Sequence, residues 1–311
     1  MSSKSIRVFA PATVANLVCG FDVMGFAVDA PGDIIEMKLE EHNEVIIEEI
    51  HGDGGKLPKE ADKNTVSISV LHFLNHLGIK KGVSIKLFKQ MPLGSGLGSS
   101  SASTIGGVFA INELLGRPLK REELLPFAME GEKLACGAAH ADNVAPALLG
   151  GFVLVRSYDP LDVVKLPKMD GLFCTLINPH ITVNTKDARA ILPKNITLED
   201  GVKQWGNIGG VVAGICLNDK LLLTRSLEDY IVEPVRSKLI PGFDDAKKSA
   251  LEVGALGGGI SGSGPSIFML SDNEETAQKI GDALKTSFFK HGLESTVYQT
   301  KVNYEGPKVW G

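Results

Sequence analysis

The sequence predicts an α+β protein built from two layered domains, and three observations support this prediction. Strand-like alternation and helix-like apolar spacing both occur in each half of the 311-residue chain. The two kinds of segment do not follow the regular strand–helix alternation of a doubly wound sheet. The length is sufficient for two domains of ordinary size. Because tyrosine, aspartate and proline cluster at residues 157–162, we expect domains at residues 1–158 and 159–311.

In the first half, alternating apolar and polar residues between turn-forming residues predict strands at residues 5–10, 33–39, 44–50, 83–89 and 152–156. Apolar residues at helical spacing predict helices at residues 64–77, from Ser99 onward, and at 121–135. Residues 138–151 contain alanine, asparagine, proline and glycine, and we expect a turn-rich connector there.

In the second half, the same patterns predict strands at residues 163–166, 172–178, 266–270 and 295–303. Helices are expected at residues 186–192, 198–218, 243–253 and 274–291. No long internal repeat is found, which argues against a solenoid or a propeller.

The stretch from residue 90 to residue 116 is the most informative part of the chain. Gly94, Gly96 and Gly98 lie among small residues, and Ser99 begins an apolar helix without a break. The N–H groups and the positive dipole end of a helix start form a ready anion site. A flexible linker is the alternative, although a linker does not usually continue into a long apolar helix. The stretch lacks the lysine of a Walker loop and the serine of a nucleophile elbow.

Composition excludes several classes of protein. The chain is 43% hydrophobic and 22% charged with a net charge of −5, which gives no support for a nucleic-acid surface. No segment has the length of a signal peptide or a membrane span, so we expect a cytoplasmic protein that binds no membrane. The four cysteines are scattered without metal-binding spacing and are expected to be free, buried thiols: Cys19, Cys136, Cys174 and Cys216.

Three separated stretches, at residues 11–29, 92–103 and 257–268, resemble the three motifs of the GHMP kinases in their order and distances. Within that superfamily, the first motif, PATVANLVCGFD, is similar to the form found in the homoserine kinases. The segments HADNVAPALLGG, TKDAR and EPVR, which begin at His140, Thr185 and Glu233, resemble the same group. The combination is far more specific than any one short motif.

The resemblance implies an N-terminal domain with a left-handed βαβ unit and a C-terminal ferredoxin-like domain, with ATP and substrate between them. The implied reaction is ATP-dependent phosphorylation of the side-chain hydroxyl of L-homoserine, on the route to threonine. The implied cofactors are ATP and Mg²⁺. The tendency of the family to dimerise suggests a homodimer.

The resemblance places the nucleotide on the second motif, whose main-chain N–H groups hold the phosphates: Pro92, Leu93, Gly94, Ser95, Gly96, Leu97, Gly98, Ser99, Ser100 and Ser101. Ser100 and Glu132 match the metal-binding pair of the family, since Mg²⁺ prefers oxygen ligands. Without the resemblance, Glu132 reads as part of a solvated helix face. Asn64 matches a contact to the base, or it is a helix N-cap.

For the amino acid, Arg189 and Arg236 match the carboxylate-binding arginines of the family, and forked guanidinium contacts suit planar anions. Asp22 matches the partner of the ammonium group. Asn16 and Asn143 are expected to hold the reacting hydroxyl. His140 and Thr185 complete the implied pocket, and Ser261 and Gly262 are expected near the ligand. Without the resemblance, the arginines read as surface residues and His140 as a structural or exposed histidine.

Asn143 occupies the position at which mevalonate kinase has an aspartate base, and an amide cannot accept the proton. The resemblance therefore implies direct transfer without a side-chain base, with Asn143, Asn16 and Arg189 as the catalytic residues. A base role for the neighbouring Asp142 is the open alternative.

The third motif satisfies the dinucleotide pattern G-x-G-x-x-G, but it leads into a strand-like segment instead of a helix. We interpret it as a glycine loop over phosphates and substrate. Two other functions stay open: a mevalonate- or shikimate-type GHMP kinase, and a non-catalytic binding protein on the same scaffold.

Overall fold

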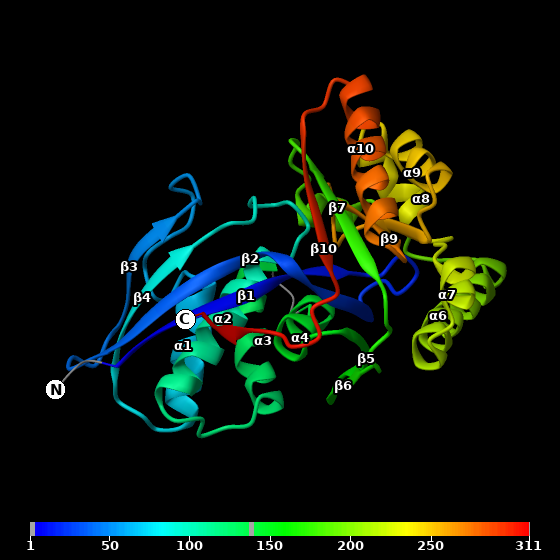
Figure 1. The fold of residues 1–311 in the computed structure, drawn as a ribbon. Helices are drawn as coiled ribbons and strands as arrows, with labels where there is room; N and C mark the ends of the chain where they lie inside the picture. Colours follow the sequence, from blue (N-terminus) through cyan, green and yellow to red (C-terminus); the bar gives the residue numbers. More distant parts are fainter. Residues whose placement is uncertain (1–3, 137–139, 311) are drawn as a thin grey trace.

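The computed structural model describes residues 4–136 and 140–310. Its first sheet has, within those residues, the strand order β11-β1-β2-β4-β3, and β5 joins β2 and β6 at the side (Figure 1). The strands are β1 (Ser5–Ala15), β2 (Met24–Glu40), β3 (Val45–His51), β4 (Gly82–Phe88), β5 (Phe152–Tyr158), β6 (Leu161–Lys165) and β11 (Lys308–Val309). β3 and β4 are parallel, and helix α1 (Thr65–His76) connects them.

Helix α2 (Ser99–Leu114) packs between the first sheet and the other helices of this half. Its small residues permit close approach, because a Cβ at Gly106 would lie 2.1 Å from Cδ1 of Ile35, and one at Gly107 would lie 2.6 Å from Cγ2 of Val66. The neighbouring helices are η1 (Glu122–Leu124), α3 (Leu125–Cys136) and α4 (Ala141–Leu149). The N-terminus of α2 is thereby fixed at the boundary between the two halves.

The second sheet is antiparallel, with the order β10-β7-β9-β8. Its strands are β7 (Phe173–Pro179), β8 (Gly257–Ile260), β9 (Ile267–Ser271) and β10 (Ser295–Lys301), and α9 (Phe243–Glu252) and α10 (Glu274–Lys290) pack with it (Figure 1). This β-α-β-β-α-β arrangement confirms the expected ferredoxin-like domain. The connection from β7 to β8 also carries α5 (Thr185–Ala190), α6 (Leu198–Leu217), α7 (Lys220–Ser226), α8 (Glu233–Arg236) and η2 (Ser237–Leu239).

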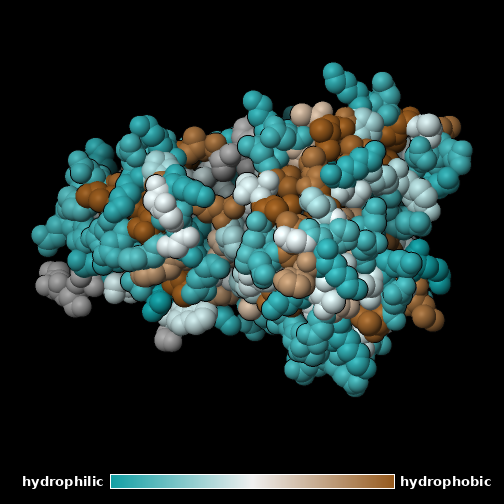
Figure 2. All heavy atoms as spheres, turned by 90° about the horizontal axis from the view of Figure 1, so that it is seen from above, coloured by the Kyte–Doolittle hydropathy of each residue, from teal (hydrophilic) through white to brown (hydrophobic). Residues whose placement is uncertain are grey.

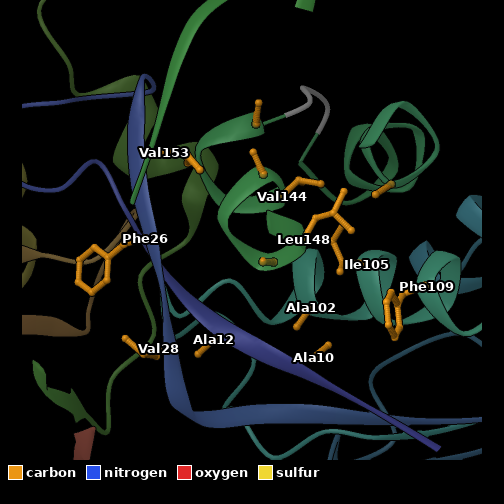
Figure 3. Close-up of a cluster of buried hydrophobic side chains, with 14 of the residues drawn as sticks. Ala10, Ala12, Phe26, Val28, Ala102, Ile105, Phe109, Val144, Leu148 and Val153 are labelled. Carbon is orange, nitrogen blue, oxygen red and sulfur yellow. The ribbon is translucent and has the colours of Figure 1, made fainter. Parts of the chain in front are cut away.

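Apolar contacts join the first sheet to residues of the second in one core, and a second apolar cluster lies between the second sheet and α9 and α10. Figure 3 shows Ala102 and Ile105 of α2 and Leu148 of α4 on the helical side of β1 and β2, with Phe26 on the other side. The ring of Phe26 lies 5.0 Å from that of Phe152 and 5.6 Å from that of Phe268, measured between centroids. Phe268 belongs to β9, so these contacts cross from the first sheet to the second.

The predicted two-domain α+β class is confirmed, and most of the expected elements are present. The connector expected at residues 138–151 is wrong, because residues 141–149 form α4 with Pro146 inside it. Residues 138 and 139 lie outside the described part. The strand expected at 33–39 is part of the longer β2, and α7, α8, β8 and β11 were not expected. β6 and β11 lie beyond residue 158 yet pair with the first sheet, and the boundary at that residue stays a prediction.

Cys19 and Cys174 are free and buried as expected, and burial raises the pKa of the Cys19 thiol to about 12. Cys216 is free as expected, but it is exposed, so its expected burial is wrong. The side chain of Cys136 lies outside the described part. Among the described residues, no helix combines the length and apolar character that crossing a bilayer requires. On the face shown in Figure 2, hydrophilic residues cover most of the surface, with small apolar groups between them.

Candidate active site

The three glycine-rich or asparagine-containing stretches predicted to carry the chemistry meet at one cavity of about 470 Å³. The predicted site residues that line it are Asn16, Asp22, Asn64, Leu93, Gly94, Ser95, Gly96, Leu97, Gly98, Ser99, Ser100, Ser101, Glu132, His140, Asn143, Thr185, Arg189, Arg236 and Gly262. Pro92 and Ser261 were also predicted and are not among the lining residues. The geometry therefore gathers nearly the whole predicted set, while the role of each residue stays a prediction.

Main-chain hydrogen bonds tie the first two stretches together. The N–H of Thr13 donates to the carbonyl of Leu97 over 3.0 Å, which fixes the end of β1 against the glycine loop. The third stretch contacts both of the others. The hydroxyl of Ser261 donates to the carbonyl of Gly96 over 2.8 Å, and the N–H of Gly262 donates to the carbonyl of Ala15 over 3.3 Å. Main-chain segments from three distant parts of the sequence are thus joined by hydrogen bonds in the cavity wall.

Glycine is required in the loop that precedes α2. Gly96 and Gly98 have φ angles of 78° and 70°. A Cβ at Gly96 would lie 2.4 Å from the carbonyl oxygen of Ser261, and one at Gly98 would lie 2.0 Å from Oγ1 of Thr13. Gly98 is the N-cap of α2 and offers no side-chain cap, so the first N–H groups of α2 remain available to a ligand. An anion at this end would also interact favourably with the helix dipole.

Beneath the start of α2 lies Lys89, a residue that sequence reasoning missed. Its ammonium group donates to the carboxylate of Asp33, to the carbonyl of Ser99 over 2.8 Å and to the hydroxyl of Ser103 over 2.7 Å. The alternation of apolar and polar residues along the strand could have indicated that Lys89 points inward. In the run VSIKLFK, Val83, Ile85 and Leu87 are buried, and Lys89 has the same parity.

Two oxygen-bearing side chains, those of Ser100 and Glu132, line the cavity near the first turn of α2. The hydroxyl of Ser100 is buried and has no hydrogen-bond partner among the described residues. Glu132 is 3% exposed, and its Oε2 accepts a hydrogen bond from the hydroxyl of Ser101 over 3.1 Å. The alternative that Glu132 lies on a solvated helix face is therefore wrong. Within residues 4–136 and 140–310, no cluster of three acidic, histidine or cysteine side chains could hold a metal by itself.

Two arginines and an aspartate also line the cavity. Nη2 of Arg189 donates to both carboxylate oxygens of Asp22, over 2.8 and 2.9 Å. Arg236 is only 4% exposed, and it donates through Nη1 to the carbonyl of Gly262 and through Nε to that of Ala188. The surface alternative is thus wrong for Arg236. It holds in part for Arg189, whose side chain is 42% exposed.

His140 contacts the same ion pair. Nη2 of Arg189 lies 3.0 Å from Nε2 of His140, and a guanidinium only donates hydrogen bonds, so the histidine accepts through this nitrogen. Burial lowers the pKa of His140, while the charge of Asp22 acts in the opposite direction. The neutral imidazole that results fits its role as an acceptor.

Two asparagines, Asn16 and Asn143, also line the cavity. Oδ1 of Asn143 accepts from the hydroxyl of Thr13 over 2.8 Å, and none of the described residues accepts from its Nδ2. Asn16 donates from Nδ2 to the carbonyl of Gly262 over 2.8 Å and accepts from the N–H of Asp22 over 3.1 Å. Within the described residues, Asn143 therefore retains an unpaired donor, whereas Asn16 is largely engaged in holding the loops.

Asp142 is a buried carboxyl group in the cavity wall. It is 2% exposed, and its Oδ1 has no hydrogen-bond partner in the described part of the chain. Burial, and then the nearby charges of Asp22 and Glu132, raise the pKa of Asp142 to about 8. The group is mostly protonated at neutral pH, which is a poor state for a general base.

The start of α1 also lines the cavity, through Asn64 and Thr65. Asn64 is the N-cap of this helix, since its Oδ1 accepts from the N–H of Val66 over 3.1 Å. Its Nδ2 donates to the carbonyl of Pro58 over 2.7 Å. The N-cap interpretation is thus confirmed, and a contact with a base stays a prediction for a second role of Asn64.

The third motif forms the loop between β8 and β9. Gly262 and Ser263 line the cavity, and the hydroxyl of Ser263 lies 3.2 Å from that of Thr185. The motif connects two antiparallel strands and opens no helix. The dinucleotide interpretation is therefore excluded for this glycine pattern.

Two family models match the chain. The model described as GHMP kinases N terminal domain matches residues 64–151, and the one described as GHMP kinases C terminal matches residues 212–291. The homoserine kinase of Chlorobium phaeovibrioides is 49% identical over 318 residues, which cover 98% of this chain and 99% of the relative. The homoserine kinase of Chloroherpeton thalassium is also 49% identical, over 98% of this chain and 99% of the relative.

Solved structures give the same result. The crystal structure of homoserine kinase from Cytophaga hutchinsonii is 63% identical and superposes with a TM-score of 0.97, covering 100% of this chain and 98% of that one. A mevalonate kinase of L. major has a TM-score of 0.74 at 14% identity, which is a likeness of fold alone.

Proposed function

The chain belongs to the homoserine kinases of the GHMP kinase superfamily, and from this membership we propose its reaction and the role of each site residue. The enzyme transfers the γ-phosphoryl group of ATP to the side-chain hydroxyl of L-homoserine, which gives O-phospho-L-homoserine for threonine biosynthesis. One observation carries the proposal: a glycine-flanked helix N-terminus and a pair of arginines with an aspartate lie in one cavity. The first suits a polyphosphate, and the second suits an amino acid.

The nucleotide lies along residues 93–101, with its phosphates on the main-chain N–H groups at the start of α2. Lys89 supports this end of the helix from below but is already engaged by Asp33 and two serines. The adenine lies toward Asn64 and its neighbours in the cavity wall. Pro92 orients the loop without contacting the ligand.

Ser100 and Glu132 fit a magnesium ion. Both oxygens border the phosphate end of the cavity, and the hydroxyl of Ser100 lacks another partner in the described residues. Mg²⁺ commonly binds only one or two oxygens of the protein, because water molecules and substrate phosphates supply its other ligands. When bound, the ion neutralises charge on the phosphoryl oxygens.

L-Homoserine is held by its two charged groups. Its carboxylate lies against Arg189 and Arg236, and its ammonium group against Asp22, with His140 and Thr185 beside them. Gly262 offers its carbonyl, which already orients both Asn16 and Arg236. This arrangement directs the hydroxyl of the substrate toward Asn143 and the γ-phosphate.

Transfer proceeds without a side-chain base. Asn143 aligns the attacking hydroxyl through its free Nδ2, and Asn16 and Arg189 keep the substrate in line. The dipole of α2 stabilises charge on the transferred group. The hydroxyl proton passes to an oxygen of the transferred phosphoryl group and from there to solvent, because the protonated Asp142 is poorly suited to accept it.

A panel of alcohols tests the proposal. In a coupled assay of ADP release, L-homoserine should be turned over with the highest kcat/KM, ahead of mevalonate and shikimate. Asn143 in place of an aspartate argues against mevalonate, and the paired arginines favour an amino acid. Turnover of mevalonate or shikimate but not L-homoserine would refute the choice of substrate, and the absence of any turnover with all three would favour a binding protein.

Two further expectations go with this function. We propose that the enzyme works in the cytoplasm, where its substrates are made and used, and that it binds neither nucleic acid nor membranes. A homodimer is proposed from the family alone, and sedimentation analysis of the purified protein would test it.

A further inference from the structure

Phe21 contacts both arginines of the substrate end, although it does not line the cavity itself. The Cζ atom of Arg189 lies 5.3 Å from the centroid of the Phe21 ring, and that of Arg236 lies 5.0 Å from it. The three residues come from separate segments: the loop after β1, helix α5 and helix α8. The ring of Phe21 therefore contacts two arginines that lie on different helices.

The two guanidinium groups have one ion pair between them among the described residues. Asp22 pairs with Arg189, while the described hydrogen bonds of Arg236 go to two main-chain carbonyls. Burial lowers the pKa of Arg236; Asp22 opposes this change and Arg189 adds to it. The electron-rich face of an aromatic ring attracts a guanidinium, and more strongly where water is excluded.

The backbone explains how the loop approaches both arginines. Asp22 directly follows Phe21 and has a φ of 60°, in the left-handed region. Its N–H donates to Oδ1 of Asn16, which closes the turn. Phe21 and Asp22 thus form one unit, in which the aspartate neutralises Arg189 and the ring orients both arginines.

We propose that Phe21 is a positioning residue that sets the spacing and orientation of Arg189 and Arg236, and through them the selectivity for a substrate with an α-carboxylate. This inference rests on the proposed function. In the free enzyme Asp22 neutralises Arg189. An incoming amino acid exchanges this contact, since its carboxylate takes the arginines and its ammonium group takes Asp22. The ring holds both guanidinium groups in place through the exchange, because the Cζ atom of each lies over its face.

Kinetics of Phe21→Leu test the proposal. We expect KM for L-homoserine to rise about tenfold, which corresponds to about 1.4 kcal/mol, with kcat and KM for ATP within about twofold of wild type. Phe21→Tyr keeps the aromatic face and should restore KM. With 3-amino-1-propanol, which has the hydroxyl and the amine but no carboxylate, Phe21→Leu and wild type should have equal kcat/KM.

Three results would overturn the proposal: an unchanged KM in Phe21→Leu, an equal loss with both alcohols, or a Phe21→Tyr variant as impaired as the leucine variant. Phe21→Met has a similar volume and no aromatic face, and it takes the place of the leucine variant if that variant folds poorly. Thermal unfolding of each variant without ligand identifies a general loss of structure.

A spectroscopic measurement separates this proposal from the proposed function. In NMR spectra of the wild-type enzyme, the Nε–Hε signals of Arg189 and Arg236 should show ring-current shifts that disappear together in Phe21→Leu and persist in Phe21→Tyr. This readout needs no turnover. If wild type fails to phosphorylate L-homoserine, the proposed function fails, whereas the absence of a ring-dependent shift refutes the role of Phe21.

Discussion

The ammonium group of Lys89 and the carboxylate of Asp33 form a buried ion pair beneath the first turn of α2, with side chains that are 2% and 0% exposed. Asp33 also accepts from the N–H groups of Gln90 and Met91 and from the hydroxyl of Ser99. One carboxylate thus fixes both the entry to the glycine loop and the residue that follows it. The shape of the phosphate end depends on this pair.

Lys89→Met should therefore destabilise the protein strongly. The methionine fills most of the space but leaves the carboxylate of Asp33 buried without its counter-charge. Breaking a buried pair in this way costs about 3–5 kcal/mol. Urea unfolding should show the loss as a lower midpoint.

Lys86→Met is the matched control, since Lys86 lies in the same run of residues and pairs with Glu49 at the surface, over 2.6 Å. Exposed pairs contribute little to stability, so its unfolding midpoint should stay near that of wild type. Equal midpoints for the two variants would contradict the importance of the buried pair.

Gly98→Ala should abolish most of the activity. The added methyl group would approach Oγ1 of Thr13 to 2.0 Å and Oδ1 of Asn143 to 3.0 Å, and these two atoms are hydrogen-bonded to each other. Displacing Asn143 by about 1 Å can lower the rate about 100-fold. The measurement is kcat/KM for L-homoserine at saturating ATP.

Gly116→Ala provides the comparison at the other end of the same helix. Gly116 has a φ of 82°, and a Cβ there would have no neighbour within 4 Å. Both variants carry the strain of a left-handed alanine, about 1–2 kcal/mol, but only Gly98→Ala meets the site. Comparable activity in the two would show that backbone strain, and not the clash, governs the effect.

Asp142 should make stability depend on pH. The pKa of this carboxyl is raised from 3.8 to about 8 by burial and by the charges of Asp22 and Glu132, while Arg189 acts in the opposite direction. Between these values the folded protein holds a proton that the unfolded chain releases. The free energy of unfolding therefore falls as pH rises from about 4 to about 8, by at most about 1.4 kcal/mol per unit, and the decline ends above that range.

Asp142→Asn removes this contribution, so the difference in stability between pH 5 and pH 8 should be smaller than in wild type. Urea unfolding at both pH values measures it. Asp272→Asn, at an exposed position, should keep the wild-type difference. A variant at position 142 whose pH dependence equals that of wild type would show that the buried carboxyl does not titrate in this range.

The same variant decides between the two mechanisms. Asp142→Asn should keep kcat near the wild-type value at pH 7, whereas Asn143→Ala should lower kcat about 100-fold with little change in KM. Steady-state kinetics with L-homoserine measure both. A loss of kcat in Asp142→Asn as large as that in Asn143→Ala would restore Asp142 as the base.

Much of this site was predictable because its chemistry is local in sequence. The spacing of Gly94, Gly96 and Gly98 before a serine-led helix indicates an anion site, with a flexible linker as the alternative, since glycine permits positive φ angles and small side chains leave the helix N–H groups accessible. The ferredoxin-like domain and the gathering of Arg189 and Arg236 came from the resemblance, because residues 47 positions apart carry no sign of their proximity.

The remaining features depend on tertiary contacts. α4 was expected to be a connector because Pro146 usually ends a helix, but packing against β1, β2 and β5 outweighs that tendency. The burial of Asp142, the position of Lys89 and the two contacts of Phe21 follow from which segments surround them. Strand parity indicated the inward direction of Lys89, but nothing in the sequence identified Asp33 as its partner.

Ser100→Ala gives a direct test of the metal site. The hydroxyl of Ser100 is buried and lacks a partner in the described chain, and a buried polar group without a partner lowers stability. The alanine variant should therefore be as stable as wild type, or slightly more stable, in the absence of ligands.

The kcat of Ser100→Ala should nevertheless fall at least about 100-fold, because a metal ion that stabilises phosphoryl charge contributes several kcal/mol. Thr224→Val removes another buried, unpartnered hydroxyl, on α7, and should match it in stability while keeping full activity. Titration of Mg²⁺ at fixed ATP completes the test, since the loss in Ser100→Ala should be partly recovered at high Mg²⁺. A Ser100→Ala variant with wild-type kcat and wild-type Mg²⁺ dependence would assign the unpartnered hydroxyl to some other role.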